Sequence, residues 1–499
     1  MIDSIAYQNK IVIYWDLPPN YQRGDLFVIK AGESIAVQTK NFHCEIPGLC
    51  ENTDYVFNVF HQKSDGSVCE FEHIESKTSK KKNIIDISMP PFSAVGDGKT
   101  INTNSIQRAI DCCDENSCVY IPAGDFLTGS LRLHSDMSIF IDKNAILHGT
   151  CNVEDYEPKI MSRFEGTELM SYAGLLNIGI LDRCKGINCS NVRIFGNGTV
   201  CGGGIELAQN VINIESKLQR DYISSLGDKI SEFEKPETIP GRVRPRLINI
   251  SCASNVLISG ITIMNGASWN VHMIYSKNII THNCRFISKG VWNGDGWDPD
   301  SSENCTIFGC EFYTGDDAIA IKSGKNPEGN TIAIPCKHIK IFDCVSHYGH
   351  GIAIGSEMSG GIDDVKIWNC DMKNTVYGVE IKATKKRGGY VKNVSVSHCD
   401  LCRILVHSVE YNDDGPPAPT PPVISDLHFN DIKLTSVIYS IDDKKEYCNP
   451  IEITGFDSDG YTVKRVALKN INISNATDTA RLLSLSCCEE VSFENICCR

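Results

Sequence analysis

The chain has 499 residues, of which 41% are hydrophobic and 22% are charged, so it can bury a large core and lacks the composition of a disordered protein. Its 62 acidic residues outnumber its 48 basic residues, which gives a formal net charge of -14. An acidic surface repels nucleic acids and anionic lipids, so we expect neither a nucleic acid nor a membrane as a partner.

The first residues and the cysteines both bear on the cell compartment. The start, MIDSIAYQNKIVIYWDLPP, contains neither the basic nor the apolar segment of a signal peptide, and no apolar stretch reaches about 18 residues. The 24 cysteines are scattered and form no pair of CxxC motifs at zinc spacing. We therefore expect a cytoplasmic protein whose thiols stay reduced and act as small buried hydrophobic groups, rather than a disulfide framework.

Residues 1–80 predict a small all-β domain, because runs such as IVIYWDL and DYVFNVF alternate apolar and polar residues between turns. Trp15 lies in an early run, and Tyr55 follows the segment LCENTD. This pattern resembles a fibronectin type III domain, in which a tyrosine forms the corner that joins two strands. Because a fold alone does not give a function, we expect a spacer domain, with a substrate-binding module as the alternative. The lysine-rich run 76–82 predicts a linker.

From residue 84 to residue 499 the pattern predicts one large repetitive domain. A unit of two short strands recurs every 23 to 34 residues from NVLISGITI at 255 onwards. The units are rich in β-branched residues, carry Asn, Asp and Gly at their corners and have no helical periodicity. We therefore predict a parallel β-helix, in which Asn and Cys at equivalent places stack from turn to turn.

Three segments interrupt the repeat. Residues 105–113 predict a short helix that caps the open N-terminal end of the β-helix. Residues 206–236 predict an amphipathic helical insertion. Residues 413–422, DDGPPAPTPP, predict an exposed loop, because proline cannot continue a ladder of strands.

Four polar motifs then follow one another at the spacing of the repeat: WNGDGWDPDSS, YTGDDAIAIKSG, HYGHGIAIGS and YGVEIKATKKRGG. Asp295 and Asp316 are 21 residues apart, Asp317 and His350 are 33 apart, and His350 and Lys382 are 32 apart. Equivalent residues on successive turns lie about 4.8 Å apart. We therefore predict that these side chains form a column on one face.

Such a column fits the hydrolysis of a glycosidic bond. Crowded carboxylates have their pKa values driven apart, so that one group can donate a proton while another activates water. Lys382 and the neighbouring Lys385, Lys386 and Arg387 add positive charge to an acidic protein. Local positive charge predicts an acidic sugar as the substrate.

The four motifs resemble those of glycoside hydrolase family 28, the polygalacturonase-like pectin hydrolases. The family pattern is N-T-D, then G-D-D or Q-D-D, then G-H-G, then R-I-K, on a right-handed parallel β-helix. The similarity covers nearly all of residues 84–499, and RPRLI at 244–248 and the fibronectin-like domain resemble exo-acting members. The resemblance implies an exo-polygalacturonase that cleaves α-1,4-linked galacturonate in pectin-derived oligosaccharides with inversion, and without a cofactor or metal ion. The sequence predicts no oligomeric state.

By this resemblance, Asp316 is the general acid, and Asp295 and Asp317 hold and deprotonate the attacking water. His350 tunes the acid. Since neighbouring residues of a regular strand point to opposite faces, Asp316 and Asp317 can share a site only where the backbone bends, and we expect that bend at Gly315.

The resemblance also implies substrate-binding residues. Lys382 would pair with a galacturonate carboxylate, and Asn293, Trp269 and His272 occupy flanking positions. The family N-T-D is here N-G-D, which keeps both polar groups.

The second departure reverses a charge, because Glu380 stands where the family has a substrate-binding arginine. Arg does not exchange with Glu without a change in what is bound. Either Arg387 replaces the missing guanidinium, or one subsite accepts something other than plain galacturonate.

Three alternative functions stay open. One is a hydrolase of rhamnogalacturonan or of a substituted galacturonan, which Glu380 favours. Another is a calcium-dependent pectate lyase, although the sequence has no clear calcium site. The last is a non-catalytic carbohydrate-binding β-helix, in which the acidic residues would be dispensable.

Overall fold

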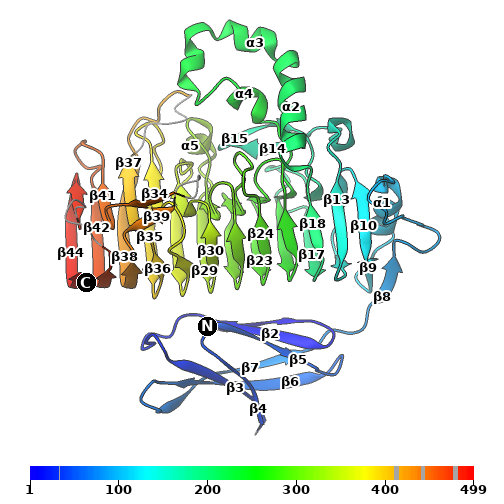
Figure 1. Ribbon diagram of the computed structural model, residues 1–499, viewed down its shortest axis with the longest axis horizontal. Coiled ribbons are helices and arrows are strands. Elements are labelled where there is room, and N and C mark those ends of the chain that lie inside the picture. The colour runs from blue at the N-terminus through cyan, green and yellow to red at the C-terminus, as the bar shows by residue number, and fades with distance from the viewer. Residues whose placement is uncertain (33, 409–414, 440–443, 476–481, 499) are drawn as a thin grey trace. The chain divides into compact units, whose positions relative to one another are not determined.

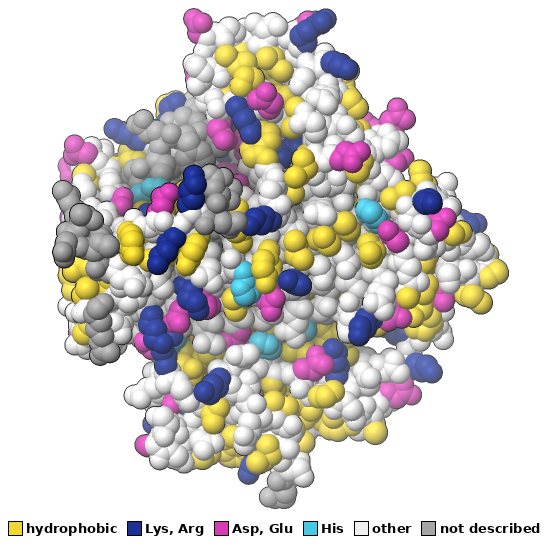
Figure 2. All heavy atoms as spheres, in the orientation of Figure 1, with side chains coloured by type: hydrophobic (Ala, Val, Ile, Leu, Met, Phe, Trp, Pro, Cys, Tyr) yellow, Lys and Arg dark blue, Asp and Glu magenta, His cyan; other side chains and the backbone are white. Residues whose placement is uncertain are grey.

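The computed structural model describes residues 1–32, 34–408, 415–439, 444–475 and 482–498. The chain divides into two units, Met1–Asn83 and Ile84–Arg499 (Figure 1). Among the described residues, no helix is long and apolar enough to cross a membrane. Acidic and basic side chains are interspersed on the face that Figure 2 presents.

The first unit is a β-sandwich, as its alternating runs predict. One antiparallel sheet has the order β1-β2-β5 and the other has the order β4-β3-β6-β7. Trp15 and Phe27 are fully buried in its core. The backbone N–H of Cys50 donates a hydrogen bond of 2.8 Å to the hydroxyl of Tyr55, which is the predicted tyrosine corner. The strands are β1 (Ile2–Ala6), β2 (Lys10–Trp15), β3 (Leu26–Ala31), β4 (Ser34–Thr39), β5 (His43–Pro47), β6 (Asp54–Gln62) and β7 (Val68–Lys77).

The second unit is a parallel β-helix, which confirms the prediction from the repeat. Each turn gives one strand to an 11-stranded parallel sheet, which we call the site sheet. Its strands, in spatial order, are β11 (Leu131–Leu133), β16 (Leu176–Ile178), β19 (Ile248–Ser251), β22 (Val271–Ile274), β25 (Trp297–Asp300), β28 (Ile319–Ile321), β31 (Gly351–Gly355), β34 (Gly378–Ala383), β37 (Ile404–Ser408), β41 (Ile451–Thr454) and β43 (Ser484–Ser486).

The remaining strands of the turns form a 22-stranded sheet around the same core. They are β8 (Asn83–Asp86), β9 (Ser117–Ile121), β10 (Gly124–Thr128), β12 (Met137–Ile141), β13 (Ala145–Gly149), β17 (Cys189–Gly196), β18 (Thr199–Cys201), β20 (Ala253–Ser259), β21 (Thr262–Met264), β23 (Lys277–His282), β24 (Arg285–Ile287), β26 (Glu303–Phe308), β27 (Glu311–Tyr313), β29 (Cys336–Phe342), β30 (Val345–Tyr348), β32 (Ile362–Trp368), β33 (Asp371–Met372), β35 (Tyr390–Ser397), β36 (Asp400–Leu401), β38 (Val423–Leu434), β42 (Val463–Ile473) and β44 (Cys488–Cys498).

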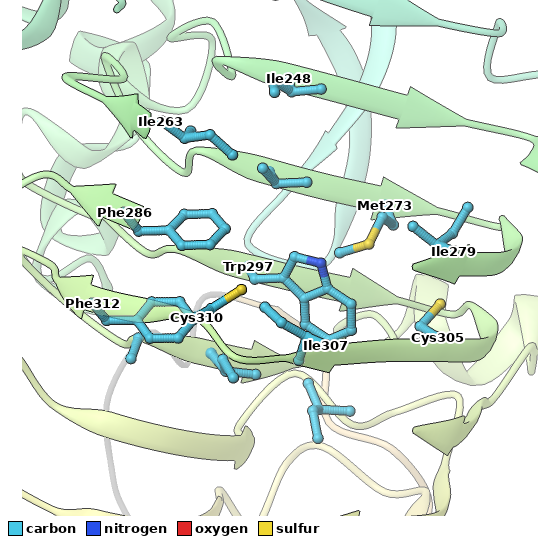
Figure 3. Close-up of a cluster of buried hydrophobic side chains, with 14 of the residues drawn as sticks. Ile248, Ile263, Met273, Ile279, Phe286, Trp297, Cys305, Ile307, Cys310 and Phe312 are labelled. Carbon is cyan, nitrogen blue, oxygen red and sulfur yellow. The ribbon is translucent and has the colours of Figure 1, made fainter. Parts of the chain in front are cut away.

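The interior of the β-helix is filled by stacked apolar side chains. Phe286 and Phe312 stack with their ring centres 4.8 Å apart (Figure 3), and Trp297 beside them is fully buried. The cysteines contribute to this core: the backbone N–H of Cys284 donates to the sulfur of Cys310, 3.4 Å away. All 24 cysteines lie among the described residues, and none forms a disulfide bond there.

Asparagines form a ladder at one corner, also as predicted. Asn255 donates to Asn191, Asn278 to Asn255 and Asn304 to Asn278, over 3.1 to 3.3 Å. Each of these four residues has a positive φ between 54° and 60°. Asparagine is one of the few residues with a side chain that tolerates this backbone conformation.

Helices and a hairpin extend the β-helix. The cap is α1 (Thr103–Asp111), and the side chain of Gln107 makes two hydrogen bonds of 2.9 Å to the backbone of Arg132 in the first strand of the site sheet. This pairing covers an edge that another strand would otherwise occupy. The insertion is helical as predicted, and α2 buries Leu207 and Val211. The elements outside the sheets are η1 (Val153–Tyr156), the antiparallel hairpin β14 (Ile160–Phe164) and β15 (Thr167–Ser171), α2 (Gly204–Leu218), α3 (Arg220–Ser225), η2 (Gly227–Glu232), α4 (Thr238–Gly241), α5 (Glu328–Ile332), and the pair β39 (Val437–Tyr439) and β40 (Lys445–Tyr447).

The predicted loop 413–422 is only partly described. Residues 413 and 414 lie outside the described residues, and 415–422 contain no strand or helix. The N–H of Ala418 donates to the carbonyl of Lys386.

Replacing Asn278 by alanine should destabilise the β-helix more than replacing it by glycine. Both variants lose the two ladder hydrogen bonds, each worth about 1 kcal/mol or less at an exposed site. Only alanine adds the strain of a side chain at positive φ, roughly 1 kcal/mol. Thermal unfolding followed by circular dichroism should give melting temperatures in the order wild type, Gly, Ala. Equal melting temperatures for all three would contradict the role of the ladder.

Candidate active site

The catalytic candidates lie just before successive strands of the site sheet. Asp295 precedes β25, Asp317 precedes β28 and His350 precedes β31. The N–H of Gly296 donates to the carbonyl of Asp317, and the N–H of Ala318 donates to the carbonyl of Gly351. Parallel hydrogen bonding therefore sets Asp295, Asp317 and His350 at equivalent places on three consecutive turns.

Lys382 does not occupy the equivalent place on the fourth turn, so that part of the predicted column is wrong. β31 and β34 pair through Ile352 and Val379, a shorter step than the 32 residues between His350 and Lys382. Tyr377 is level with His350, and Lys382 is level with Gly355. The long side chain of Lys382 nevertheless brings its Nζ to 3.4 Å from Oδ2 of Asp317.

The backbone bends before β28, where the sequence predicts a bend at Gly315. Gly315 and Asp316 form a bend outside the strand. A Cβ on Gly315 would lie 2.4 Å from the carbonyl oxygen of Val291, so no side chain fits there. As a result, Asp316 Oδ1 and Asp317 Oδ1 lie 2.9 and 3.4 Å from the same atom, Nδ1 of His350.

The charges of this cluster drive its pKa values apart. Burial, together with the neighbouring Asp316 and Asp317, raises the pKa of Asp295 to about 8, although Lys322 opposes this shift. Burial also acts to raise the pKa of Asp317, but Lys382 and His350 outweigh it and hold that pKa below its ordinary value. Burial would lower the pKa of His350, yet the two carboxylates beside it raise that pKa well above its ordinary value. Near neutral pH the free site therefore holds a protonated Asp295, an ionised Asp317 and an imidazolium at His350.

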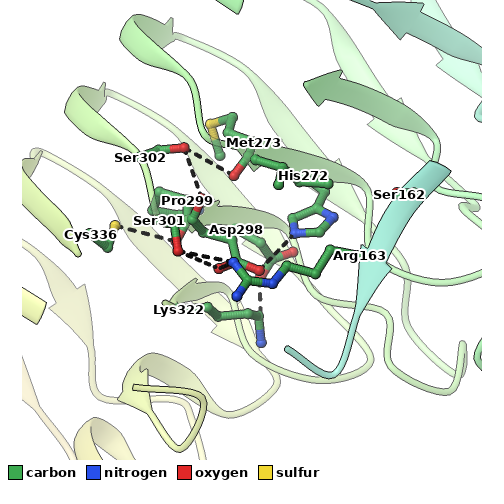
Figure 4. Close-up of polar contacts among 12 residues, drawn as sticks. Ser162, Arg163, His272, Met273, Asp298, Pro299, Ser301, Ser302, Lys322 and Cys336 are labelled. Carbon is green, nitrogen blue, oxygen red and sulfur yellow. Dashed lines mark hydrogen bonds and ion pairs between the residues drawn. The ribbon is translucent and has the colours of Figure 1, made fainter. Parts of the chain in front are cut away.

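A second buried network supports the first, and sequence analysis missed its central cation (Figure 4). Lys322 Nζ lies 3.4 Å from Asp295 Oδ2 and 3.9 Å from Asp298 Oδ1. Asp298 is fully buried, and burial together with Asp295 raises its pKa well above the ordinary value. The alternation of DDAIAIK could have revealed Lys322, because buried Ile319 and Ile321 turn residue 322 to the same face as Asp300.

The flanking residues take different places. Trp269 is 2% exposed and lies beneath Lys322, whose Nζ is 4.4 Å from the centre of the ring. His272 is fully buried, with Nε2 3.5 Å from Asp300 Oδ2, and burial lowers its pKa to about 4, so it is neutral. Asn293 accepts a hydrogen bond of 2.7 Å from Arg244.

Arg387 is directed into the protein. Its guanidinium is 1% exposed and donates to Oδ1 of Asn326 at 2.8 Å and to the carbonyl of Ser356 at 3.1 Å. A substrate-binding role for Arg387 stays a prediction, and these contacts do not favour it.

The hairpin β14–β15 reaches the site, which the sequence did not predict. Arg163 Nη1 lies 2.8 Å from Asp300 Oδ1, and the ring of Phe164 stacks on Trp269 at 4.8 Å. Arg246 of the RPRLI segment donates to the carbonyl of Arg163 at 2.8 Å. The hairpin is therefore pinned to the turns that carry the catalytic residues.

Among the described residues, one group of side chains could hold a metal ion. Ligand atoms of Asp316, Asp317 and His350 lie within 4.8 Å of one another. Because the two carboxylates raise the pKa of His350 above its ordinary value, a metal ion would have to displace a proton from its imidazole. The site is better suited to proton transfer.

Carboxyl groups with separated pKa values, gathered on one face of a parallel β-helix, provide the acid and the base that hydrolysis of a glycosidic bond requires. Residues 113–412 match the family described as "Glycosyl hydrolases family 28". The chain belongs to this family, and the resemblance seen in its four motifs is confirmed.

Individual relatives extend this match. The chain is 33% identical over 319 residues to a "Probable polygalacturonase" of Vitis vinifera, covering 62% of this chain and 59% of that protein. It is 24% identical over 546 residues to the "Exo-poly-alpha-D-galacturonosidase" of Dickeya chrysanthemi, covering 99% of this chain and 89% of that protein. The fold is that of the family 28 exopolygalacturonase of Yersinia enterocolitica, with a TM-score of 0.81 and 24% identity over 100% of this chain and 97% of the other.

Asp295→Asn should change the pH dependence of stability. The folded-state pKa of Asp295, about 8, lies above its unfolded value. The folded state therefore binds the extra proton, and stability is lost as pH rises from about 4 through 8. The amide cannot ionise, so the variant should melt above wild type at pH 8, by roughly 2 °C or more, with a smaller difference at pH 5.

Asp317→Asn is the matched control with the opposite sign. The pKa of Asp317 is lowered in the folded state, so its carboxylate contributes stability above the unfolded pKa and loses it as pH falls. This variant should melt below wild type at neutral pH. Parallel melting curves for both variants across the pH range would contradict the assigned charge states.

Proposed function

We propose that this chain is an exo-acting polygalacturonase, which releases galacturonate from the end of pectin-derived oligosaccharides with inversion at the anomeric carbon. The observation that carries the proposal is the run of contacts from Asp316 through His350 and Asp317 to Lys382. It combines a proton donor, a base and an ammonium group that keeps the base ionised, as the acid–base cleavage of a glycosidic bond requires.

In this mechanism Asp316 protonates the leaving oxygen. Its side chain is 24% exposed, whereas that of Asp317 is 5% and that of Asp295 is 4% exposed. Asp316 is thus the carboxyl group most open to a bound sugar. The two buried carboxyl groups hold the attacking water, which approaches the anomeric carbon from the side opposite the leaving oxygen.

The proton needed for the reaction is already present in the free site. At neutral pH it resides on Asp295, whose pKa is raised to about 8. Coupled carboxyl groups share such a proton, so substrate binding can redistribute it within the cluster and leave Asp295 ionised to accept a proton from water.

The hairpin β14–β15 supports action at a chain end. It contacts β25 through Arg163 and stacks Phe164 on Trp269, just before β22. Its tip continues to the loop after β28, where the N–H of Lys325 donates to the carbonyl of Gly166. The hairpin thus lies beside the catalytic turns, and we infer that it limits how far a bound polymer can extend past them.

We place the enzyme in the cytoplasm, where it would trim imported oligogalacturonides. The support is that no disulfide bond links the 24 cysteines of the described residues, most of which are buried. Cysteines without disulfides are typical of a reducing compartment. Cell fractionation tests this placement, and recovery of the enzyme outside the cell would contradict it.

The products from polygalacturonate should reveal exo action, because any single cleavage of trigalacturonate gives galacturonate and digalacturonate. From the polymer we expect monomer with little loss of viscosity. Proton NMR of the fresh product should show the β-anomer, because inversion at an α-linkage gives β. A mixture of intermediate oligomers from the polymer would contradict exo action.

Asp316→Asn should lower kcat by a factor of about 10² to 10⁴, the usual contribution of a general acid, with a small change in KM. Asp111→Asn, at an exposed residue of α1, serves as the control and should leave both constants unchanged. Unchanged turnover in Asp316→Asn would refute its role.

A further inference from the structure

Glu380 stands in place of the arginine of the family motif and is a buried carboxylate that forms ion pairs with His407 and Lys382. Its side chain is 4% exposed, and Oε1 lies 2.6 Å from Nε2 of His407 on the next turn of the site sheet. Oε2 lies 3.3 Å from Nζ of Lys382. The replacement of arginine by Glu380 is therefore accompanied by an ion-pair partner for Glu380. This partner, His407, lies outside the family motif.

Lys382 is held between two carboxylates as a result. Its Nζ is 3.3 Å from Glu380 and 3.4 Å from Asp317. Burial acts to raise the pKa of Glu380, but Lys382 and His407 outweigh it and hold that pKa below its ordinary value. Both of these carboxylates are thus ionised, so the positive charge of Lys382 is already paired before any substrate binds.

A substrate carboxylate that approached Lys382 would meet these two negative charges. Like charges at such distances repel, and a partly buried lysine shared by two carboxylates has little attraction left for a third. The strands on either side of Glu380 place Ala353 and Leu405 level with it. These neighbours are apolar and offer no second cation at this level.

We propose that Glu380, which His407 holds in place, keeps Lys382 in its ion pair with Asp317. The sugar residue bound beside Glu380 and Lys382 is then not recognised through a free carboxylate. The pair is then a specificity determinant that accepts a methyl-esterified galacturonate at that subsite. Lys382 acts as a positioning residue for Asp317 rather than as a substrate ligand. The inference rests on the proposed galacturonan hydrolase activity.

The test compares digalacturonate with its two monomethyl esters, one esterified on each sugar. For the wild type, one of the two esters should be hydrolysed with a kcat/KM within about fivefold of the free acid. Glu380→Arg should then disfavour that same ester at least tenfold relative to the free acid. Glu380→Gln, which keeps the shape and releases Lys382, should shift the ratio in the same direction and covers the case in which the arginine variant does not fold.

Glu215→Gln is the matched control, because Glu215 is also a buried carboxylate bound by a lysine, 2.7 Å from Lys159, but lies in the helical insertion. Its ratio of ester to free acid should equal that of the wild type. Loss of more than fivefold on both esters in the wild type would overturn the inference, as would Glu380 variants with an unchanged ratio. Failure to hydrolyse the free acid as well as both esters would instead refute the proposed function.

Discussion

The whole site depends on the register of the site sheet. Hydrogen bonds between successive parallel strands fix Asp295, Asp317 and His350 at one level, although 22 and 33 residues separate them in the chain. Packing in the interior fixes the register, because each turn has to point one apolar side chain inward. On the three catalytic turns these side chains are Trp297, Ile319 and Ile352. A slip of one residue would turn each side chain to the opposite face. The stacked core therefore aligns the chemistry outside it.

Placing these acids at one level destabilises the folded state, because carboxylates that are buried close together repel one another. The site offsets this repulsion with cations of two kinds. His350 and Lys382 keep Asp317 ionised, while Lys322 lies between Asp295 and Asp298. Asp295 and Asp298 thereby favour the protonated form while Asp317 stays ionised, without any change of residue type. Division of labour between identical side chains follows from what surrounds each of them.

Much of the fold was predictable, because local chemistry repeats. The recurring units indicate the β-helix, the Asn residues at its corners indicate the ladder, and Gly315 indicates the bend before Asp316. The position of Lys382 along its strand, relative to His350 on the preceding turn, was not predictable. The length of each connection sets the step between strands, and the spacing of two motifs does not say how many residues lie in the loop.

Contacts between distant segments were also beyond the sequence. The hairpin β14–β15 binds Asp300 through Arg163, 137 residues away. His407 joins Glu380 from the following turn, and no motif marks it. The packing of the turns in space determines which residues make such contacts, so the sequence alone does not reveal them. The departure at Glu380 could be seen in the sequence, but its consequence for Lys382 could not.

The central claim is that register places these acids together and thereby separates their charge states. The most direct measurement is a carbon-13 NMR titration of labelled aspartate carboxyl groups in the intact enzyme, with Asp295→Asn and Asp317→Asn to assign the signals. The account predicts one carboxyl that titrates near pH 8 and disappears in Asp295→Asn, and another that stays ionised well below the usual range and disappears in Asp317→Asn. Titration of both groups near the ordinary aspartate value would contradict it.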